Sequence, residues 1–527
     1  MDTKALRQKI LDLAIRGKLV PQDPNDEPAS VLLERIRTEK QQMVKDGKLK
    51  AKDIKNDTVI FKGDDSLHYE QFADGTVKCI EDEIPFDLPE GWEWCRLQTL
   101  CVKEIKRGKA PKYEEKSNTL VFAQKCNTKA GYIDISKAKF LDQSTLKKYT
   151  DEDYLSYNDI IINSTGTGTL GRIGIYMESD DAYGIKIVPD SHITIVRTMS
   201  SEMNSRYVYY FLKYHQSYFE NSGVGSTNQK ELKPEVISTF LVAVPPIEEQ
   251  NNIVSKIDIA NNYSFDLDNK KEQLKELISA IKSKILDLAI RGKLVPQNPN
   301  DEPASVLLER IRAEKEELIK QGKIKRDKKE SVIFKGDDNS YYEKIGDEIT
   351  CIDDELPFEI PDNWCWARLS SFTEVIMGSS PRSQDICRDS NYTEFHQGKI
   401  YFSDCLLKES NQYTKKISKI APKNSVLLCV RAPVGEVNIT DREICIGRGL
   451  SSIHAYDKIQ SNFLFYWLKT QKHVLVNKST GSTFSAITVD TVKKILLPIP
   501  PITEQLRITQ KILDLNSNIE SIKASLS

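Results

Sequence analysis

The stretch "KILDLAIRGKLVPQ" occurs twice in the chain, at residues 9–22 and again at 284–297. The sequence "PNDEPASVLLERIR" follows both copies, so that residues 9–37 match residues 284–312 at all but one position. A shared pattern of apolar residues does not produce identical side chains over such a length. The chain therefore contains a duplicated unit.

The duplication extends through most of both halves. Further matches are "VIFKGDD" at 59–65 and 332–338, "DEIPFDLPEGWEWCRL" at 82–97 with "DELPFEIPDNWCWARL" at 354–369, and "PPIEEQ" at 245–250 with "PPITEQ" at 500–505. The identity between the two halves falls sharply in the residues that separate the 82–97 and 354–369 match from the "PPIxEQ" match. Each half therefore consists of a nearly identical frame around a divergent block of about 140–155 residues.

The residues after "PPIEEQ" predict a long amphipathic helix over about 247–291, because apolar residues recur at helical spacing and Gly292 and Pro296 end the pattern. A break near "NNYSF" (261–265) is the alternative to one continuous helix. The C-terminal residues resemble the start of this helix and the N-terminal residues resemble its end. Joined tail to head, the termini would rebuild a second copy, packed antiparallel to the first as a coiled coil.

The other repeated segments predict smaller elements of the frame. After each spacer, "ASVLLERIR" predicts a helix with Asp26 or Asp301 as its N-cap and Gly47 or Gly322 at its C-terminus. A Lys-rich stretch and the hairpin-like "VIFKGDD" follow and form an accessory element. Within the divergent blocks, apolar runs such as "DIIINST" and "KIYFS" predict strands of mixed α/β domains.

We therefore predict an α+β protein in which two mixed α/β domains are joined by two long antiparallel spacer helices, with the pseudo-two-fold symmetry of a circularly permuted repeat. The predicted segments are a first spacer part (1–20), a frame element (21–90), the first mixed α/β domain (91–245), the central spacer helix (246–292), a second frame element (293–362), the second mixed α/β domain (363–500) and the last spacer part (501–527).

Composition and missing motifs exclude several classes of function. No apolar run approaches about 18 residues, so no membrane span is expected, and the N-terminus lacks the apolar core of a secretory signal. The 10 cysteines are scattered without metal-ligand spacing, which predicts reduced thiols and no metal site. Nucleotide-binding, zinc-protease and hydrolase signatures are missing, as is an Asn-Pro-Pro-aromatic methylation motif, so no catalytic residue is predicted.

Charge is distributed unevenly although the whole chain carries a net charge of −2. Residues 91–245 hold 20 Lys and Arg against 18 Asp and Glu, and residues 363–500 hold 18 against 11. Two neutral-to-basic blocks thus lie in an acidic frame. A basic surface can neutralise nucleic-acid phosphates, and an ordinary solvated surface is the alternative, chiefly for the first block.

Three pairs of corresponding loops contain the candidate site residues. They are "NSTGTGTLGR" (163–172) with "CVRAPVGE" (429–436), "KRGKAPKY" (106–113) with "MGSSPRSQ" (377–384), and "GSTNQK" (225–230) with "GSTFSA" (481–486). Such loops expose backbone N–H groups, lysines and hydroxyls to phosphate, while Arg pairs with guanine and Asn or Gln with adenine. The alternatives are tight glycine turns and solvated loop residues.

The predicted DNA-binding residues are Lys106, Arg107, Lys109, Lys112, Ser164, Thr165, Thr167, Arg172, Thr227, Asn228, Gln229, Lys230, Ser379, Arg382, Gln384, Arg431, Arg448, Ser482 and Thr483.

With its two divergent blocks, repeated helical spacers, "PPIxEQ" motifs, "GWEWCRL"/"NWCWARL" block openings and "TGTxG" and "RAPVG" loops, the chain resembles the specificity subunit of type I restriction–modification systems over essentially its whole length. The resemblance implies that each block (91–245 and 363–500) is a target recognition domain, which reads one half of a split, asymmetric site in double-stranded DNA. It implies that the spacers set the gap and dock two methylation subunits, and that restriction subunits complete the complex. S-adenosylmethionine, ATP and Mg²⁺ then belong to the partner subunits, in a bacterial or archaeal cytoplasm at the nucleoid.

Two other classes of function compete with this interpretation. A fused methyltransferase or nuclease would be an enzyme, against which the missing motifs argue. A structural scaffold whose blocks bind protein would show no sequence preference and no salt-dependent DNA binding.

Overall fold

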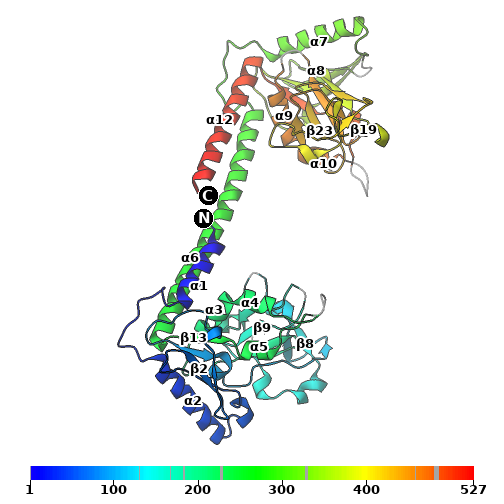
Figure 1. The fold of residues 1–527 in the computed structure, drawn as a ribbon. Coiled ribbons are helices and arrows are strands. Elements are labelled where there is room, and N and C mark those ends of the chain that lie inside the picture. The colour runs from blue at the N-terminus through cyan, green and yellow to red at the C-terminus, as the bar shows by residue number, and fades with distance from the viewer. Residues whose placement is uncertain are drawn as a thin grey trace. The chain divides into compact units, whose positions relative to one another are not determined.

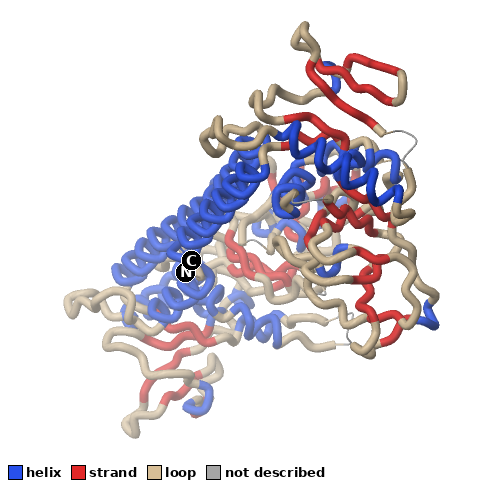
Figure 2. Tube along the Cα trace, turned by 90° about the horizontal axis from the view of Figure 1, so that it is seen from above, coloured by secondary structure: helices blue, strands red, loops and turns tan. Residues whose placement is uncertain are grey.

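The chain folds into two compact units, residues 1–271 and 272–527. The computed structural model describes residues 2–129, 131–166, 168–181, 184–225, 230–326, 330–456, 459–479 and 486–526. Among these residues, no helix combines the length and the apolarity needed to cross a bilayer. Each unit contains helices and several small sheets, as Figures 1 and 2 show.

Among the residues that the structure describes, the first unit contains five complete α-helices and the beginning of a sixth. These are α1 (Thr3–Ile15), α2 (Ala29–Lys45), α3 (Ser205–Tyr214), α4 (Gln216–Asn221), α5 (Pro234–Ser238) and the first part of α6 (Ile247–Ile290). Its strands are β1 (Val59–Lys62), β2 (His68–Gln71), β3 (Val77–Cys79), β4 (Glu93–Arg96), β5 (Lys106–Arg107), β6 (Tyr113–Glu114), β7 (Thr119–Phe122), β8 (Lys139–Leu141), β9 (Ile160–Asn163), β10 (Ile173–Ile175), β11 (Lys186–Pro189), β12 (Ile193–Val196) and β13 (Leu241–Val244).

The second unit repeats this plan. Its helices are the last part of α6, α7 (Ala304–Lys320), α8 (Leu369–Phe372), α9 (Ser461–Thr470), α10 (Lys472–Asn477), α11 (Val489–Lys493) and α12 (Ile502–Leu526). Its strands are β14 (Ser331–Lys335), β15 (Tyr341–Ile345), β16 (Glu348–Cys351), β17 (Cys365–Arg368), β18 (Thr373–Met377), β19 (Ile386–Cys387), β20 (Thr393–His396), β21 (Tyr413–Thr414), β22 (Ile420–Ala421), β23 (Val426–Cys429), β24 (Val437–Ile439), β25 (Ile444–Ile446), β26 (Leu450–Ala455) and β27 (Leu496–Ile499).

The predicted long helix is present as α6, which runs for 44 residues without the alternative break near residues 261–265. At 1.5 Å per residue it is about 66 Å long. In the first unit α1 lies antiparallel to it (Figure 1). The Thr3 hydroxyl donates to Asp268 (2.7 Å), and beyond the other end of α1 the Gln22 amide donates to Glu249 (3.1 Å).

The second unit contains the matching helix pair. Lys282 near the end of α6 forms an ion pair with Glu520 of α12 (2.9 Å), and the Gln297 amide donates to Glu504 near the start of α12 (2.5 Å). The order of these contacts makes α12 antiparallel to α6. In each unit a repeated stretch therefore packs against a helix that begins at a "PPIxEQ" motif.

The glutamate of each "PPIxEQ" motif connects the frame to the start of a recognition domain. The indole N–H of Trp92 donates to Glu249 Oε2 at 2.8 Å, and that of Trp364 donates to Glu504 Oε2 at 2.9 Å. Burial raises the pKa of both carboxyl groups above their ordinary value. The repeated Trp and Glu residues thus fix each recognition domain to its spacer helix.

Two local predictions for the frame and the second block are corrected. The N-cap positions of α2 and α7 are occupied by Pro28 and Pro303, not by Asp26 and Asp301, and no side chain donates or accepts a capping hydrogen bond there. The first backbone N–H of each helix instead donates to the carbonyl of Gly91 (2.9 Å) or Asn363 (3.0 Å). In the second block, "KIYFS" forms a short 3-10 turn over Lys399–Tyr401 and not a strand.

Each recognition domain begins and ends with neighbouring antiparallel strands. In the first, β4 pairs with β13, and in the second, β17 pairs with β27, with Cys365 opposite Ile499. Between them lie sheets ordered β10-β9-β12-β5 and β11-β7-β8-β6 in the first unit, and β18-β26-β23-β24 and β19-β21-β20-β25-β22 in the second. The two ends of each domain are therefore adjacent in space, which makes the domain a module inserted into the frame.

Candidate nucleic-acid interface

Three segments distant in the sequence meet at one end of strand β9 in the first unit. The loop 164–172 connects β9 to β10, which pair as an antiparallel hairpin. The backbone N–H of Ser164 donates to the His192 carbonyl (2.8 Å), and the Ser164 carbonyl accepts from the backbone N–H of Leu232 (2.8 Å). The structure thus brings the loop next to the turn before β12 and the segment after residue 230.

Arg107 joins the predicted loop 106–113 to this cluster. Its guanidinium donates to the Leu232 carbonyl (2.8 Å) and forms an ion pair with Glu231 (2.7 Å). Lys109 instead forms an ion pair with Asp153 at 2.6 Å. These two cations have partners inside the protein, whereas Lys106, Lys112 and Lys230 are exposed and have no ion pair with an acidic residue that the structure describes.

The hydroxyl groups of the loop hold its conformation. Ser164 is fully buried and its Oγ lies 2.5 Å from Oγ1 of Thr194, so this hydroxyl does not face solvent. The half-buried Thr165 hydroxyl lies 2.7 Å from Nδ1 of His192, and it accepts a hydrogen bond from the Gln124 amide at 2.6 Å. Sequence analysis missed His192 and Gln124, because no local pattern distinguishes either residue from other polar loop residues.

Arg172, at the end of the same loop, is also half-buried. Its guanidinium donates to the carbonyls of Asn127 (2.7 Å) and Gly168 (3.1 Å). This arrangement closes the loop on itself. Arg172 therefore supports the loop in the structure and keeps only part of its donor capacity for another molecule.

The second unit builds its loop on the same backbone plan with different side chains. Val430 occupies the place of Ser164: its N–H donates to the Gly449 carbonyl (2.9 Å), and its carbonyl accepts from the N–H of Ile487 (3.0 Å). The neighbouring segment after β18 is attached through Gly378, whose N–H donates to the Leu450 carbonyl (2.9 Å). All five predicted residues described here are exposed: Ser379, Arg382, Gln384, Arg431 and Arg448.

The remaining predicted residues, Thr167, Thr227, Asn228, Gln229, Ser482 and Thr483, lie outside the residues that the structure describes.

The aligned glycines of the two loops share one conformation. Gly171 has φ +73° and Gly435 has φ +86°, both in the left-handed region that favours glycine. A Cβ at Gly171 would lie 2.4 Å from the backbone nitrogen of Glu220, and one at Gly435 would lie 3.1 Å from Cα of Lys472. Both loops therefore turn closely over a short helix that follows a longer one.

Gly378→Ala is expected to destabilise the second recognition domain by about 2–4 kcal/mol, because added atoms in a packed site force the backbone apart. The new Cβ would lie 2.2 Å from the carbonyl oxygen of Gly447. Gly398→Ala is the control, since no atom lies within 4 Å of a Cβ at that position. Chemical denaturation followed by fluorescence measures the effect, and equal stabilities of the two variants would contradict it.

A buried charge cluster supports the second recognition domain. Glu394 of β20 accepts hydrogen bonds from Arg442 (2.6 Å) and from the backbone N–H of Ser410 (2.7 Å), and it lies 2.8 Å from the ring of His396. Burial opposes ionisation, but the hydrogen bonds from His396 and Arg442 outweigh it and lower the pKa of Glu394 to about 2. The carboxylate thus stays charged throughout the neutral range.

This shift predicts acid sensitivity of the second unit. Because the pKa of Glu394 is depressed in the folded state, its stabilising contribution is complete above its unfolded pKa of about 4.5 and is lost as pH falls towards 2. We expect a loss of about 2–3 kcal/mol between pH 5 and pH 2. Glu394→Gln removes the titrating group, so urea denaturation of this variant should lack that part of the pH dependence. Identical pH profiles for the two proteins would contradict the assignment.

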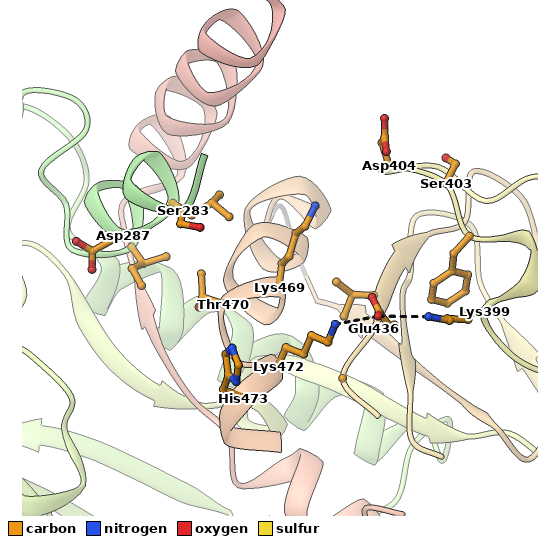
Figure 3. Close-up of a pocket in the computed structure, with 15 residues that line it drawn as sticks. Ser283, Asp287, Lys399, Ser403, Asp404, Glu436, Lys469, Thr470, Lys472 and His473 are labelled. Atoms are coloured by element: carbon orange, nitrogen blue, oxygen red, sulfur yellow. Dashed lines mark hydrogen bonds and ion pairs between the residues drawn. The ribbon is translucent and has the colours of Figure 1, made fainter. Parts of the chain in front are cut away.

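A cavity of about 580 Å³ in the second unit lies between the last part of α6, helices α9 and α10, and the loop that contains Gly435. In Figure 3, Glu436 lies between Lys399 and Lys472, and its carboxylate is 3.5 and 2.9 Å from the two ammonium groups. In the first unit the Tyr214 hydroxyl at the end of α3 donates to Asp12 of the frame (2.9 Å). Helix α9 ends in Thr470 at the corresponding position, and the hydroxyl of Thr470 donates to the carbonyl of Trp467 within its own helix (2.7 Å).

Within the described part of the chain, no group of three or more His, Cys, Asp or Glu residues is arranged to hold a metal ion.

The chain is similar to specificity subunits of type I restriction enzymes. The family model for the type I restriction modification DNA specificity domain matches residues 89–276 and 361–527. The type I restriction enzyme EcoAI specificity subunit of Escherichia coli is 27% identical, in an alignment that covers 99% of this chain and 90% of that protein. The EcoEI specificity subunit of Escherichia coli is 31% identical, with 69% of this chain and 61% of that protein covered.

A solved structure has a similar fold. It comes from work on complex assembly and conformational transition of the type I R-M system, and it matches with a TM-score of 0.52 at 20% identity. The match covers 84% of this chain and 94% of the solved one.

Proposed function

Because the chain belongs to the family of type I restriction modification DNA specificity domains, we propose that it is the non-catalytic specificity subunit of a type I restriction–modification complex. Each recognition domain reads one half of a bipartite, asymmetric DNA site. The observation that carries this proposal is the pair of loop clusters with one backbone plan and different exposed side chains. Recognition of two different half-sites requires different side chains in the two domains, and the repeated frame holds both sets in equivalent positions.

The exposed cations of each cluster are the proposed contacts to DNA. In the first domain these are Lys106, Lys112 and Lys230, and in the second Arg382, Arg431 and Arg448, with Ser379 and Gln384 as further donors. Thr167, Thr227, Asn228, Gln229, Ser482 and Thr483 keep their proposed role as contacts. Arg107, Lys109, Ser164, Thr165 and Arg172 are proposed to hold the loops in place.

We propose that the spacer helices set the distance between the half-sites. In each unit a terminal helix, α1 or α12, contacts α6, and the two together are proposed to act as the second spacer of a circularly permuted repeat. Exposed apolar residues along α6, among them Tyr263, Phe265 and Leu277, offer a surface for two methylation subunits. Restriction subunits join the complex in the cytoplasm, and S-adenosylmethionine, ATP and Mg²⁺ are used by the partner subunits.

Single-molecule methylation sequencing tests this function in cells with and without the gene. If the proposal holds, one bipartite motif with methylated adenines disappears on deletion and returns on complementation. An unchanged set of methylated motifs, in cells where the chain and its methylation subunit are both produced, would overturn it. A scaffold without base recognition would leave the motif intact.

A further inference from the structure

A row of exposed and half-buried side chains crosses one face of the small sheet β1-β2-β3 in the first unit. Phe61 pairs with Tyr69 and Tyr69 pairs with Cys79, so all three side chains lie on the same face of the sheet. The two rings stack with their centroids 5.9 Å apart, and Phe61 is 40% exposed. Val77, two residues before Cys79, shares this face and is 52% exposed. We call this face the outer face of the first unit.

The sheet β14-β15-β16 of the second unit repeats this outer face. Phe334 pairs with Tyr342, and Tyr342 pairs with Cys351. The ring centroids are again 5.9 Å apart, and Phe334 is 41% exposed. Ile349, the counterpart of Val77, is 55% exposed. The strands β3 and β16 have different sequences, "VKC" and "EITC", and yet the apolar residue and the thiol keep their places.

The opposite face of each sheet is fixed to the frame. Ile60 and Ile333 pack against the core of their units. Glu70 of β2 forms a buried ion pair with Arg96 (2.7 Å), and Glu343 of β15 forms the same pair with an arginine of β17 (2.6 Å). The sheets are thus held rigidly by one face. The apolar residues of the outer face do not contribute to the core of their unit. Exposed apolar residues that lie together in this way are typical of interaction surfaces.

The segments that contain the two outer faces are acidic. Residues 57–90 contain 10 Asp and Glu against 2 Lys, a net charge of −8, and residues 330–362 contain 11 against 2, a net charge of −9. Asp65 and Asp338 lie at the rows themselves, where each accepts a hydrogen bond from the neighbouring tyrosine hydroxyl at 2.7 Å. Such a surface repels nucleic-acid phosphates and attracts a protein surface that carries Lys and Arg.

We propose that the two outer faces are equivalent docking sites for one kind of protein subunit, bound once per unit, which presents an apolar patch surrounded by Lys and Arg. Identical side chains in one register recognise identical partner surfaces, whereas the readers between them have diverged. The bound subunit is the methylation subunit, and this identification rests on the proposed function, in which two copies of that subunit bind the chain. The outer faces add contacts separate from those along α6.

The exposed thiols of Cys79 and Cys351 allow a test on the unaltered protein. The chain, alone and assembled with its methylation subunit, is alkylated with a maleimide and the modified cysteines are quantified by mass spectrometry. We expect the modification of both thiols to slow by roughly tenfold or more in the complex, because alkylation needs an accessible thiolate. Cys387 of the recognition domain is the internal control and should keep its rate.

Each other outcome overturns the inference. If the complex forms and both thiols stay reactive, the outer faces are not covered. If only one becomes protected, the sites are not equivalent. If protection appears in the chain alone and grows with its concentration, the occupant is a second copy of the chain. If the chain binds no methylation subunit at all, the proposed function itself fails.

Charge-bearing variants supply a second, independent test. Phe61→Lys and Phe334→Lys place a cation in the outer face, opposite the apolar patch of the partner and close to the cations around that patch. Both positions are exposed enough for folding to survive. Native mass spectrometry should show one methylation subunit bound instead of two in each single variant, and a further loss in the double variant. Tyr132→Lys, at a 58% exposed position of the first recognition domain, is the matched control. Two copies bound to both single variants at wild-type affinity would overturn the proposal.

Discussion

Replacing Arg382, Arg431 and Arg448 together by alanine should weaken binding of the assembled complex to its DNA target by at least about 100-fold, because contacts of this kind contribute about 1–3 kcal/mol each. All three guanidinium groups are exposed, and no ion pair joins them to an acidic residue that the structure describes. Their segments are joined by backbone hydrogen bonds to β25 and β26 and to the neighbouring loop. Fluorescence anisotropy with a labelled duplex at fixed salt measures the loss.

The control for this triple variant is Arg388→Ala, which removes an exposed arginine of the same domain outside the loop cluster. It should lower the affinity by no more than roughly twofold, the effect expected from removing one positive charge outside the interface. A triple variant that binds as tightly as Arg388→Ala would remove the second loop cluster from the proposed interface.

Arg96→Met should destabilise the first unit by about 3–5 kcal/mol, because it leaves a buried carboxylate without its partner. Arg96 donates from Nε and Nη2 to the two oxygens of Glu70 at 3.0 and 2.7 Å, and the Glu70 side chain is only 4% exposed. Thermal unfolding should then separate into two transitions, with the second unit unchanged. Methylation at the target site should fall because one reader loses its frame.

The double variant Arg96→Met with Glu70→Gln separates this mechanism from a general loss of packing. Removing both charges should restore part of the stability that the single variant loses. Arg368→Met should transfer the early transition to the second unit, where the same ion pair is present. A single variant with the wild-type unfolding profile would show that the buried pair does not hold the sheet to the recognition domain.

The architecture was predictable to the extent that it is repeated or periodic. The match of residues 9–37 with 284–312 at all but one position identified the frame, and the helical spacing of apolar residues identified α6. The N-caps of α2 and α7 were not predictable, because their first N–H groups bind carbonyls of Gly91 and Asn363, far away in the sequence. Local capping preference was overruled by a tertiary contact.

The candidate site was predictable as loops but not as individual contacts. Glycine spacing and alignment identified both loops. Sequence could not tell that Arg107 has an acidic partner while Arg431 has none among the described residues, since that partner, Glu231, is far away along the chain. It also could not tell that Ser164 is buried by the strand of Thr194. Which side chain of a loop remains free depends on long-range neighbours.

The most direct test of the central claim is to exchange residues 363–500 for the corresponding block of a relative that has a different second reader. Because β17 and β27 pair at the two ends of this block, the exchange keeps its junctions within one sheet. Methylation sequencing should then show a motif in which one half is new while the other half and the gap are unchanged. A motif altered in both halves, or in neither, would contradict the assignment of one half-site to each recognition domain.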